Sequence, residues 1–471
     1  MKPALVLACL GLCAESFGAQ PSWLSRQDLD AARALRDRAL AHNQAYALVE
    51  SLTTEVGPRL AGSPGDRAAV DWAERNLMRL EFANVRRMEV IVPRWNRGTA
   101  SLTIIAPFQQ SFATLALGGS IGTPDEGIRA RVVPVTDLAA LKALPPGVVA
   151  GKIVFFTQHT DRTRDGTGYG HAVQVRAGGA SAAAALGAAA IVIRSIGTDN
   201  NRLPHTGAMV YNIAAPRIPA AAISNPDADL LERALHLDSG CELELKITAR
   251  DLPQTRSANV IAEIPGTDRA GEIVLLGAHL DSWDPGVGAI DDGAGVAIVI
   301  AAAHLLRDIE PRPRRTVRVV LFANEELGLS GSNTYAQREG DALARHAIAM
   351  EADLGSGPVW QLSSHVSAAS LPFVAEVARA LAPLGVARGT NDAKGGSDLT
   401  VLSAGGVPVI APQLDATRYF DFHHTANDTL DKVEPQALNQ SVAAFAITAY
   451  LAARADGDLG RAPVEPPVKR P

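Results

Sequence analysis

The sequence predicts an α/β protein built on a mixed, mainly parallel sheet with helices on both faces, interrupted by a second unit rich in β-strands. From residue 256 onward, near-continuous apolar runs alternate with helical segments, which is typical of parallel strands buried on both faces. In residues 120–248, short β-rich runs alternate instead with Gly- and Ala-rich helices. A length of 471 residues leaves room for both units.

Helices are expected at three places in the main unit. Residues 27–54 carry apolar side chains at helical spacing, and a Gly–Pro loop then leads into an amphipathic helix over residues 64–80. A further helix is expected over residues 293–307, between two strands. Residues 20–119 and 249–457 would then form one discontinuous domain around the insert.

The composition is that of a globular protein, with 47% hydrophobic and 20% charged residues and no long polar tract. The formal net charge of −6 gives no reason to expect nucleic acid or an anionic membrane surface as a partner.

The N-terminus has the anatomy of a targeting segment. Lys2 precedes an apolar stretch over residues 4–14 that is too short to span a bilayer, so residues 1–19 are expected to be a cleaved secretory signal. A lipoprotein signal ending at Cys13 is disfavoured by the bulky Leu12. We therefore expect an exported protein, periplasmic or extracellular, without a stable membrane anchor.

Cysteine usage excludes thiolate chemistry in the mature chain. Cys9 and Cys13 lie in the expected signal, which leaves Cys241 alone. One cysteine forms neither an intramolecular disulfide nor a Cys-based metal cluster, so any metal site must use His, Asp and Glu. At the other end, the Pro-rich residues 458–471 are expected to be a disordered tail.

Acidic and imidazole side chains follow the ends of successive predicted strands, where parallel sheets bind their ligands. Packing so many carboxylates together would be repulsive without a cation. Imidazole and carboxylate groups without thiolates suit zinc, with cobalt or manganese as substitutes. The side chains are His279, Asp281, Asp291, Asp292, Glu325, Glu326, Glu351, Asp353, His423, His424 and Asp428.

Each of these signals alone has a structural explanation. A single histidine at a strand end is usually a satisfied core or surface residue. Asp291 and Asp292 could form a turn and a helix N-cap, and Glu325 with Glu326 could begin a solvated helix. Their coincidence at one sheet edge is what favours a metal site.

The order and spacing of these motifs resemble the co-catalytic dizinc exopeptidases that include bacterial leucyl aminopeptidases. The resemblance spans residues 50–450 and is closest to the carboxypeptidase Q-like branch, with "VGPRLAGSPGD", "PHTG", "GGSD" and "YFDFHHT" as shared features. It implies the zinc exopeptidase (phosphorylase/hydrolase-like) fold. It also implies that residues 120–248 are a protease-associated domain that caps or flanks the cleft, with a passive spacer as the alternative.

The resemblance also implies two zinc ions per chain and a ligand set for them. One aspartate would bridge the ions, and a water shared between them would attack the peptide carbonyl. The implied ligands are Asp291 as the bridge, His279 and Asp353 on one ion, and Glu326 and His424 on the other.

Two further roles follow from the same resemblance. Successive residues leaving a strand point in opposed directions, so Glu326 would face the metal while Glu325 acts as the general base. Asp281 would hold the far ring nitrogen of His279 and fix its tautomer. The Asp291–Asp292 peptide bond is expected to be cis, as it often is in such relatives.

The function expected is that of a secreted zinc-dependent exopeptidase acting on short peptides or dipeptides. The alternatives are an aminopeptidase on longer peptides, a non-catalytic binding protein on the same fold, and a one-zinc acyl-transfer enzyme of the glutaminyl cyclase type. The retained ligands and base argue against the last two. Homodimers are possible, since relatives in this branch form them.

The sequence leaves the end specificity open. Glu351 could hold a substrate α-amine or could support the metal ligands instead. Arg418 and Lys394 are candidate cations for an α-carboxylate. His205, in the "PHTG" motif, could reach the cleft or could be structural.

Overall fold

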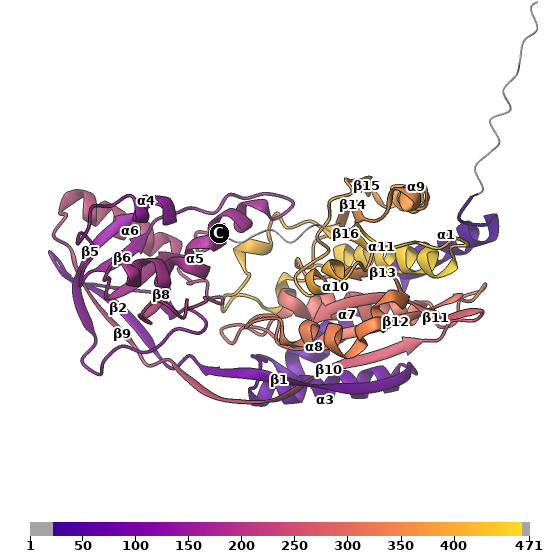
Figure 1. Ribbon diagram of the computed structural model, residues 1–471, viewed down its shortest axis with the longest axis horizontal. Coiled ribbons are helices and arrows are strands. Elements are labelled where there is room, and N and C mark those ends of the chain that lie inside the picture. Colours follow the sequence, from indigo (N-terminus) through magenta and orange to yellow (C-terminus); the bar gives the residue numbers. More distant parts are fainter. Residues whose placement is uncertain (1–21, 464–471) are drawn as a thin grey trace, which may run out of the picture.

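A computed structural model describes residues 22–463, so the expected signal at 1–19 and the last eight residues of the tail, 464–471, lie outside the described residues. The chain forms two mixed eight-stranded sheets, each with its own hydrophobic core (Figure 1). Within residues 22–463, no helix combines the length and the apolar character needed to cross a bilayer.

The first sheet confirms the predicted mixed α/β class. Its central strands run parallel and are flanked by antiparallel neighbours. The strand order is β1 (Ala83–Asn96), β10 (Arg250–Ile264), β12 (Arg315–Phe322), β11 (Arg269–His279), β13 (His346–Glu351), β16 (Val409–Leu414), β14 (Val359–His365) and β15 (Ala387–Arg388).

Helices cover both faces of this sheet. The core on one face includes side chains from α1 (Arg26–Ala41), α2 (Ala45–Ser51), α3 (Pro64–Arg79), α7 (Ala294–Leu305), α9 (Leu371–Leu381) and α11 (Pro435–Arg454). The other face packs against α8 (Ser330–Glu339) and α10 (Thr400–Ala404). The three expected helical regions are present, although the first is broken between α1 and α2. At the start of α3 the Ser63 side chain accepts the Asp66 N–H, and Pro64 follows this cap.

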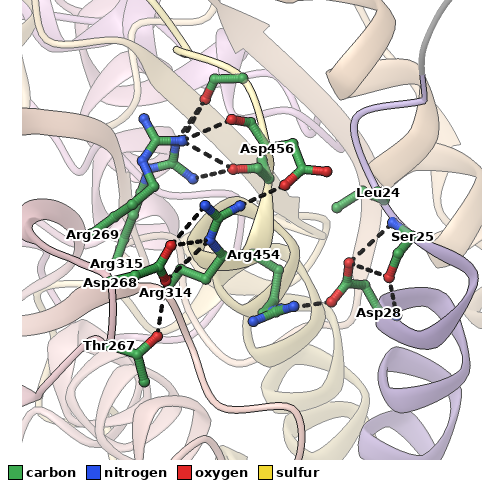
Figure 2. Close-up of polar contacts among 12 residues, drawn as sticks. Leu24, Ser25, Asp28, Thr267, Asp268, Arg269, Arg314, Arg315, Arg454 and Asp456 are labelled. Atoms are coloured by element: carbon green, nitrogen blue, oxygen red, sulfur yellow. Dashed lines mark hydrogen bonds and ion pairs between the residues drawn. The ribbon is translucent and has the colours of Figure 1, made fainter.

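Polar contacts fasten the C-terminal end of α11 to α1 and to the start of β12 (Figure 2). Arg454 Nε donates to Asp28 in α1 at 2.6 Å. The fully buried Arg315 donates to the carbonyls of Ala452, Ala455 and Gly457 at 2.7–2.9 Å. The bond to Ala452 satisfies a carbonyl that the helix leaves open in its last turn, and the other two fix the chain just beyond the helix.

The second sheet lies at the other end of the molecule, and the long β1–β10 ribbon runs between the two (Figure 1). Its helices are α4 (Leu138–Lys142), α5 (Thr167–Ala185) and α6 (Asn225–Leu237). Its strand order is β3 (Gln110–Phe112), β2 (Ala100–Ala106), β9 (Glu242–Ile247), β5 (Ile128–Val135), β6 (Ile153–Phe156), β7 (Ala190–Arg194), β8 (Ala220–Ile223) and β4 (Thr114–Ala116).

This second sheet starts earlier than the expected insert boundary at residue 120. Strand β2 pairs antiparallel with β9, with Leu102 opposite Leu245, and so belongs to the second sheet. Residues 100–119 contain short apolar runs that look like the strands predicted on either side of them. The partner that assigns it to the second sheet lies about 140 residues further along the chain, which the local pattern does not reveal.

Candidate metal centre

The strand ends of the first sheet converge as the sequence predicts. His279 is the last residue of β11 and pairs in parallel register with Phe322, the last residue of β12. On the other side of β11, Glu351 ends β13 opposite Gly277. Glu325, Glu326 and Asp353 follow these ends within a few residues, so one edge of the sheet gathers them all.

Five of the predicted residues form one compact cluster around Asp291. His279 Nε2 lies 3.2 Å from Asp291 Oδ1 and 3.5 Å from Asp353 Oδ1. His424 Nε2 lies 3.2 Å from Asp291 Oδ2 and 3.1 Å from Glu326 Oε2. Asp291 therefore directs one carboxylate oxygen towards each pair, as a bridging ligand would.

Both imidazoles are held by backbone carbonyls. His279 Nδ1 donates to the Asp281 carbonyl at 3.0 Å, and His424 Nδ1 donates to the Thr206 carbonyl at 3.2 Å. A carbonyl only accepts, so each contact places the ring proton on Nδ1 and leaves the Nε2 lone pair for a metal.

The Asp281 carboxylate lies near the His279 ring but makes its hydrogen bond elsewhere. Its carboxylate lies 3.8 Å from His279 Nδ1, and Oδ1 accepts the backbone N–H of Glu325 at 3.0 Å instead. The short turn after β11 brings the Asp281 carbonyl to the ring and sends the side chain towards the next strand end. Asp281 thus positions both the histidine and the glutamate.

Asp292 has a supporting position. The Asp291–Asp292 peptide bond is cis, as expected. The Asp292 carboxylate accepts the backbone N–H groups of His279 and Gly295, each at 3.1 Å. Asp428 accepts the Ile290 N–H at 2.8 Å. Both aspartates therefore fix the loop that carries Asp291.

The donor set fits a cation. Asp291 Oδ2 and Glu326 Oε1 are buried and have no hydrogen-bond partner among residues 22–463. Burial raises the pKa of Glu326 well above its usual value, and the nearby Asp291 adds to this rise. Burial also opposes ionisation of Asp291, but its contacts with the His279 and His424 rings hold its pKa well below the ordinary range. A divalent cation would satisfy the open oxygens and relieve the repulsion.

Two other predicted residues lie at the edge of the cluster. His423 Nε2 is 3.6 Å from Asp291 Oδ2, and its ring stacks on that of His424 with centroids 3.4 Å apart. The Glu351 carboxylate accepts the backbone N–H groups of Asp398 and Leu399 at 3.3 and 3.1 Å. Glu351 thus anchors the "GGSD" segment and does not line the cleft.

The cluster opens into a cleft of about 390 Å³ that both units line. The first unit supplies Asp291, Glu325, Glu326 and Asp353. The second unit supplies Asp165, Tyr169, Arg176 and Ala208 from α5 and the loops beside it, and Tyr419, Phe420 and the two histidines complete the wall. Neither Arg418 nor Lys394 lines this cleft.

The second unit also holds the segment that carries His423 and His424. His205 Nδ1 donates to the His423 carbonyl at 2.7 Å, and the Thr206 N–H donates to the His424 carbonyl at 3.1 Å. The ring of His205 is buried, and its Nε2 lies 2.7 Å from Asp199 Oδ1. His424 has a φ of 62°, a left-handed conformation that a non-glycine residue keeps only when its surroundings impose it.

Sequence reasoning missed three residues of the site. Arg59, in "VGPRLAG", is fully buried and donates to the carbonyls of Leu280, Val287 and Gly288 at 2.6–2.9 Å, so it braces the loop before Asp291. Arg176 and Thr206 approach the cleft from the second unit. Arg59 lies in a motif that the sequence shares with the resembling family, which could have drawn attention to it. Nothing in the local sequence of Arg176 points to the cleft.

Comparison with known proteins identifies a family of peptidases. The model for peptidase family M28 matches residues 259–449. Carboxypeptidase Q of Bos taurus is 36% identical over 421 residues, which cover 89% of this chain and 88% of the relative, and carboxypeptidase Q of Homo sapiens is 34% identical over 435 residues, which cover 92% and 90%.

One solved structure supports the same assignment, and a second shares the fold. A peptidase M28 precursor from Shewanella amazonensis SB2B is 48% identical, with a TM-score of 0.90, over 93% of this chain and 99% of that one. An aminopeptidase from Aneurinibacillus sp. strain AM-1, at 23% identity and a TM-score of 0.61, shares the fold over 94% of this chain and 100% of that one. The chain therefore belongs to peptidase family M28.

Proposed function

We propose that this metallopeptidase is an exported exopeptidase that hydrolyses short peptides or dipeptides and uses two zinc ions per chain. The observation that supports this best is the arrangement around Asp291, whose two carboxylate oxygens face two different histidine–carboxylate pairs. His279 and Asp353 would hold one ion, and Glu326 and His424 the other. Zinc, when bound, would polarise the scissile carbonyl and lower the pKa of the attacking water.

Glu325 is the general base of the proposed reaction. It lines the cleft next to Asp291 and Asp353, and its backbone is fixed by Asp281. Burial raises the pKa of the Glu325 carboxyl well above its usual value. A carboxylate with a raised pKa accepts a proton from water more readily, and the acid so formed delivers that proton to the leaving amine.

The test is hydrolysis of one dipeptide in three forms: free, N-acetylated and C-amidated. The zinc-loaded mature protein is assayed beside Glu325→Gln as the blank. Cleavage of the free form alone means that both termini are recognised, as in a dipeptidase. Cleavage of the amidated form as well supports the alternative of an aminopeptidase, and cleavage of the acetylated form as well supports a carboxypeptidase. No cleavage of any form, with two zinc ions bound, refutes the proposal in favour of a binding protein.

A further inference from the structure

A buried arginine from the second unit faces the metal cleft. Arg176, on α5, is 6% exposed and lines the cleft together with Asp291 and Glu326. No other lysine or arginine is among the described residues that line it. Arg176 is therefore an isolated cation in a cleft dominated by carboxylates.

The guanidinium of Arg176 is held by neutral groups only. Nε donates to the Ala208 carbonyl at 3.2 Å, Nη1 to the Thr206 carbonyl at 3.3 Å, and Nη2 to the Tyr169 hydroxyl at 2.6 Å. Between residues 22 and 463, no carboxylate oxygen lies within 4 Å of it. A guanidinium has five N–H donors, so these three contacts leave two of them unused.

Three other buried arginines of this chain either pair with carboxylates or use every nitrogen in hydrogen bonds. Arg194, also in the second unit, pairs with Asp229 and Glu232 at 2.7 and 2.6 Å. Arg318 pairs with Glu263 and Glu339 at 2.8 and 3.0 Å. Arg59 has no carboxylate but uses all three of its nitrogens on backbone carbonyls. Arg176 thus lacks the counter-ion that a buried charge ordinarily requires.

The neighbours of Arg176 fix it in place and add a donor. Gly207 packs so closely that a Cβ there would lie 2.2 Å from Arg176 Nη1. Tyr169 stacks on Phe420 with centroids 4.6 Å apart, and burial raises the pKa of its hydroxyl to about 12, so it stays protonated. That hydroxyl accepts from Arg176, and the described residues provide no acceptor for its own proton. Arg176 and Tyr169 together therefore present unused N–H and O–H donors.

We propose that Arg176, assisted by Tyr169, binds the C-terminal α-carboxylate of a short peptide whose scissile bond lies at the metal centre. This inference rests on the proposed function and names its substrate class: peptides with a free C-terminus. A planar guanidinium is well suited to a carboxylate, and a substrate carboxylate would supply the missing counter-ion. The acidic wall of the cleft would repel this end of the peptide anywhere except at Arg176.

The test compares a dipeptide with its C-terminal amide on the zinc-loaded full protein. We expect Arg176→Met to lower kcat/KM for the free acid about 100-fold and to change that for the amide less than about threefold, since only the acid loses a charge-assisted contact. Arg176→Lys should retain part of the preference for the acid. The control is Arg129→Met, which removes an exposed arginine of the same unit paired with Glu244, and it should change neither value.

Binding gives a second readout that does not depend on turnover. Calorimetry on the zinc-loaded Glu325→Gln protein should show tighter binding of the acid than of the amide, and Arg176→Met should abolish this difference while zinc content stays unchanged. Equal losses for acid and amide would overturn the proposal, because Arg176 would then only hold residues 206–208. If Arg176→Met does not fold, Arg176→Lys decides, since an unaltered preference for the acid would also overturn the proposal.

Different results would refute the proposed function and the inference about Arg176. If the wild-type protein holds two zinc ions but cleaves neither compound, the proposed function fails, whatever the binding data show. If it cleaves dipeptides and the choice between acid and amide is the same with and without Arg176, only the present inference fails.

Discussion

Replacing His205 by alanine would test whether the second unit holds a metal ligand in place. His205 bridges the Asp199 carboxylate and the His423 carbonyl, each at 2.7 Å, one residue before the proposed metal ligand His424. The substitution removes both contacts and leaves the Asp199 side chain, which is 4% exposed, without this partner. It also frees the backbone that keeps His424 at a φ of 62°.

The size of the effect follows from these contacts. The bond to the His423 carbonyl contributes about 1 kcal/mol, and the contact with a buried carboxylate contributes about 1.5–3 kcal/mol. We therefore expect the free energy of unfolding to fall by about 3 kcal/mol. Losing an outer partner of a metal ligand commonly weakens metal affinity about 10- to 100-fold, and we expect a zinc dissociation constant raised within this range.

The assay combines chelator competition for zinc with urea unfolding. The matched control is His236→Ala, which removes an exposed histidine of α6 in the same unit and should change neither quantity. If His205→Ala lowers the free energy of unfolding but leaves the zinc dissociation constants unchanged, then His205 is only structural and the positioning argument is wrong.

Three other predictions concern the ligands, the loop and the core. If the proposed ligand set is right, Glu326→Gln should leave about one zinc per chain by mass spectrometry, because Glu326 would hold only the ion shared with His424. Retention of both ions would contradict the assignment. Arg59→Met should lower the free energy of unfolding by about 3–5 kcal/mol in urea, because three buried carbonyls lose their donor; a loss below about 1 kcal/mol would argue against this brace. Burial lowers the pKa of His346 to about 4, so between pH 6.5 and 4 the unfolded chain binds a proton that the folded chain does not. Stability should therefore fall as the pH falls through this window, by about 3 kcal/mol from His346, and His346→Gln should reduce the difference between urea titrations at pH 7 and 4.5.

Much of the fold and of the ligand cluster could be predicted from the sequence because the signals are local. Apolar runs of strand length, helix starts such as the one at Pro64, and polar residues just after each strand all lie within short windows. Parallel pairing then brings residues such as His279 and Glu326 to one edge of the sheet, although they are 47 positions apart. This is a general property of parallel sheets.

Features that depend on distant packing were missed. Arg176 reaches the cleft because α5 of one unit packs beside residues 419–424, nearly 250 positions later. The pairing of β2 with β9 likewise spans the whole insert. The hydrogen bond of the Asp281 side chain to the Glu325 backbone was not foreseen, because the turn that follows β11 sets the orientation of that side chain. Arg418 and Lys394 were considered as candidates for their charge alone, which does not specify position.

The most direct test of the two-metal account is the anomalous diffraction of zinc-soaked crystals, recorded on both sides of the zinc absorption edge. The account predicts two peaks on opposite sides of the Asp291 carboxylate, one in contact with His279 and Asp353 and the other with Glu326 and His424. A single peak at full occupancy, or two peaks that Asp291 does not bridge, would contradict it.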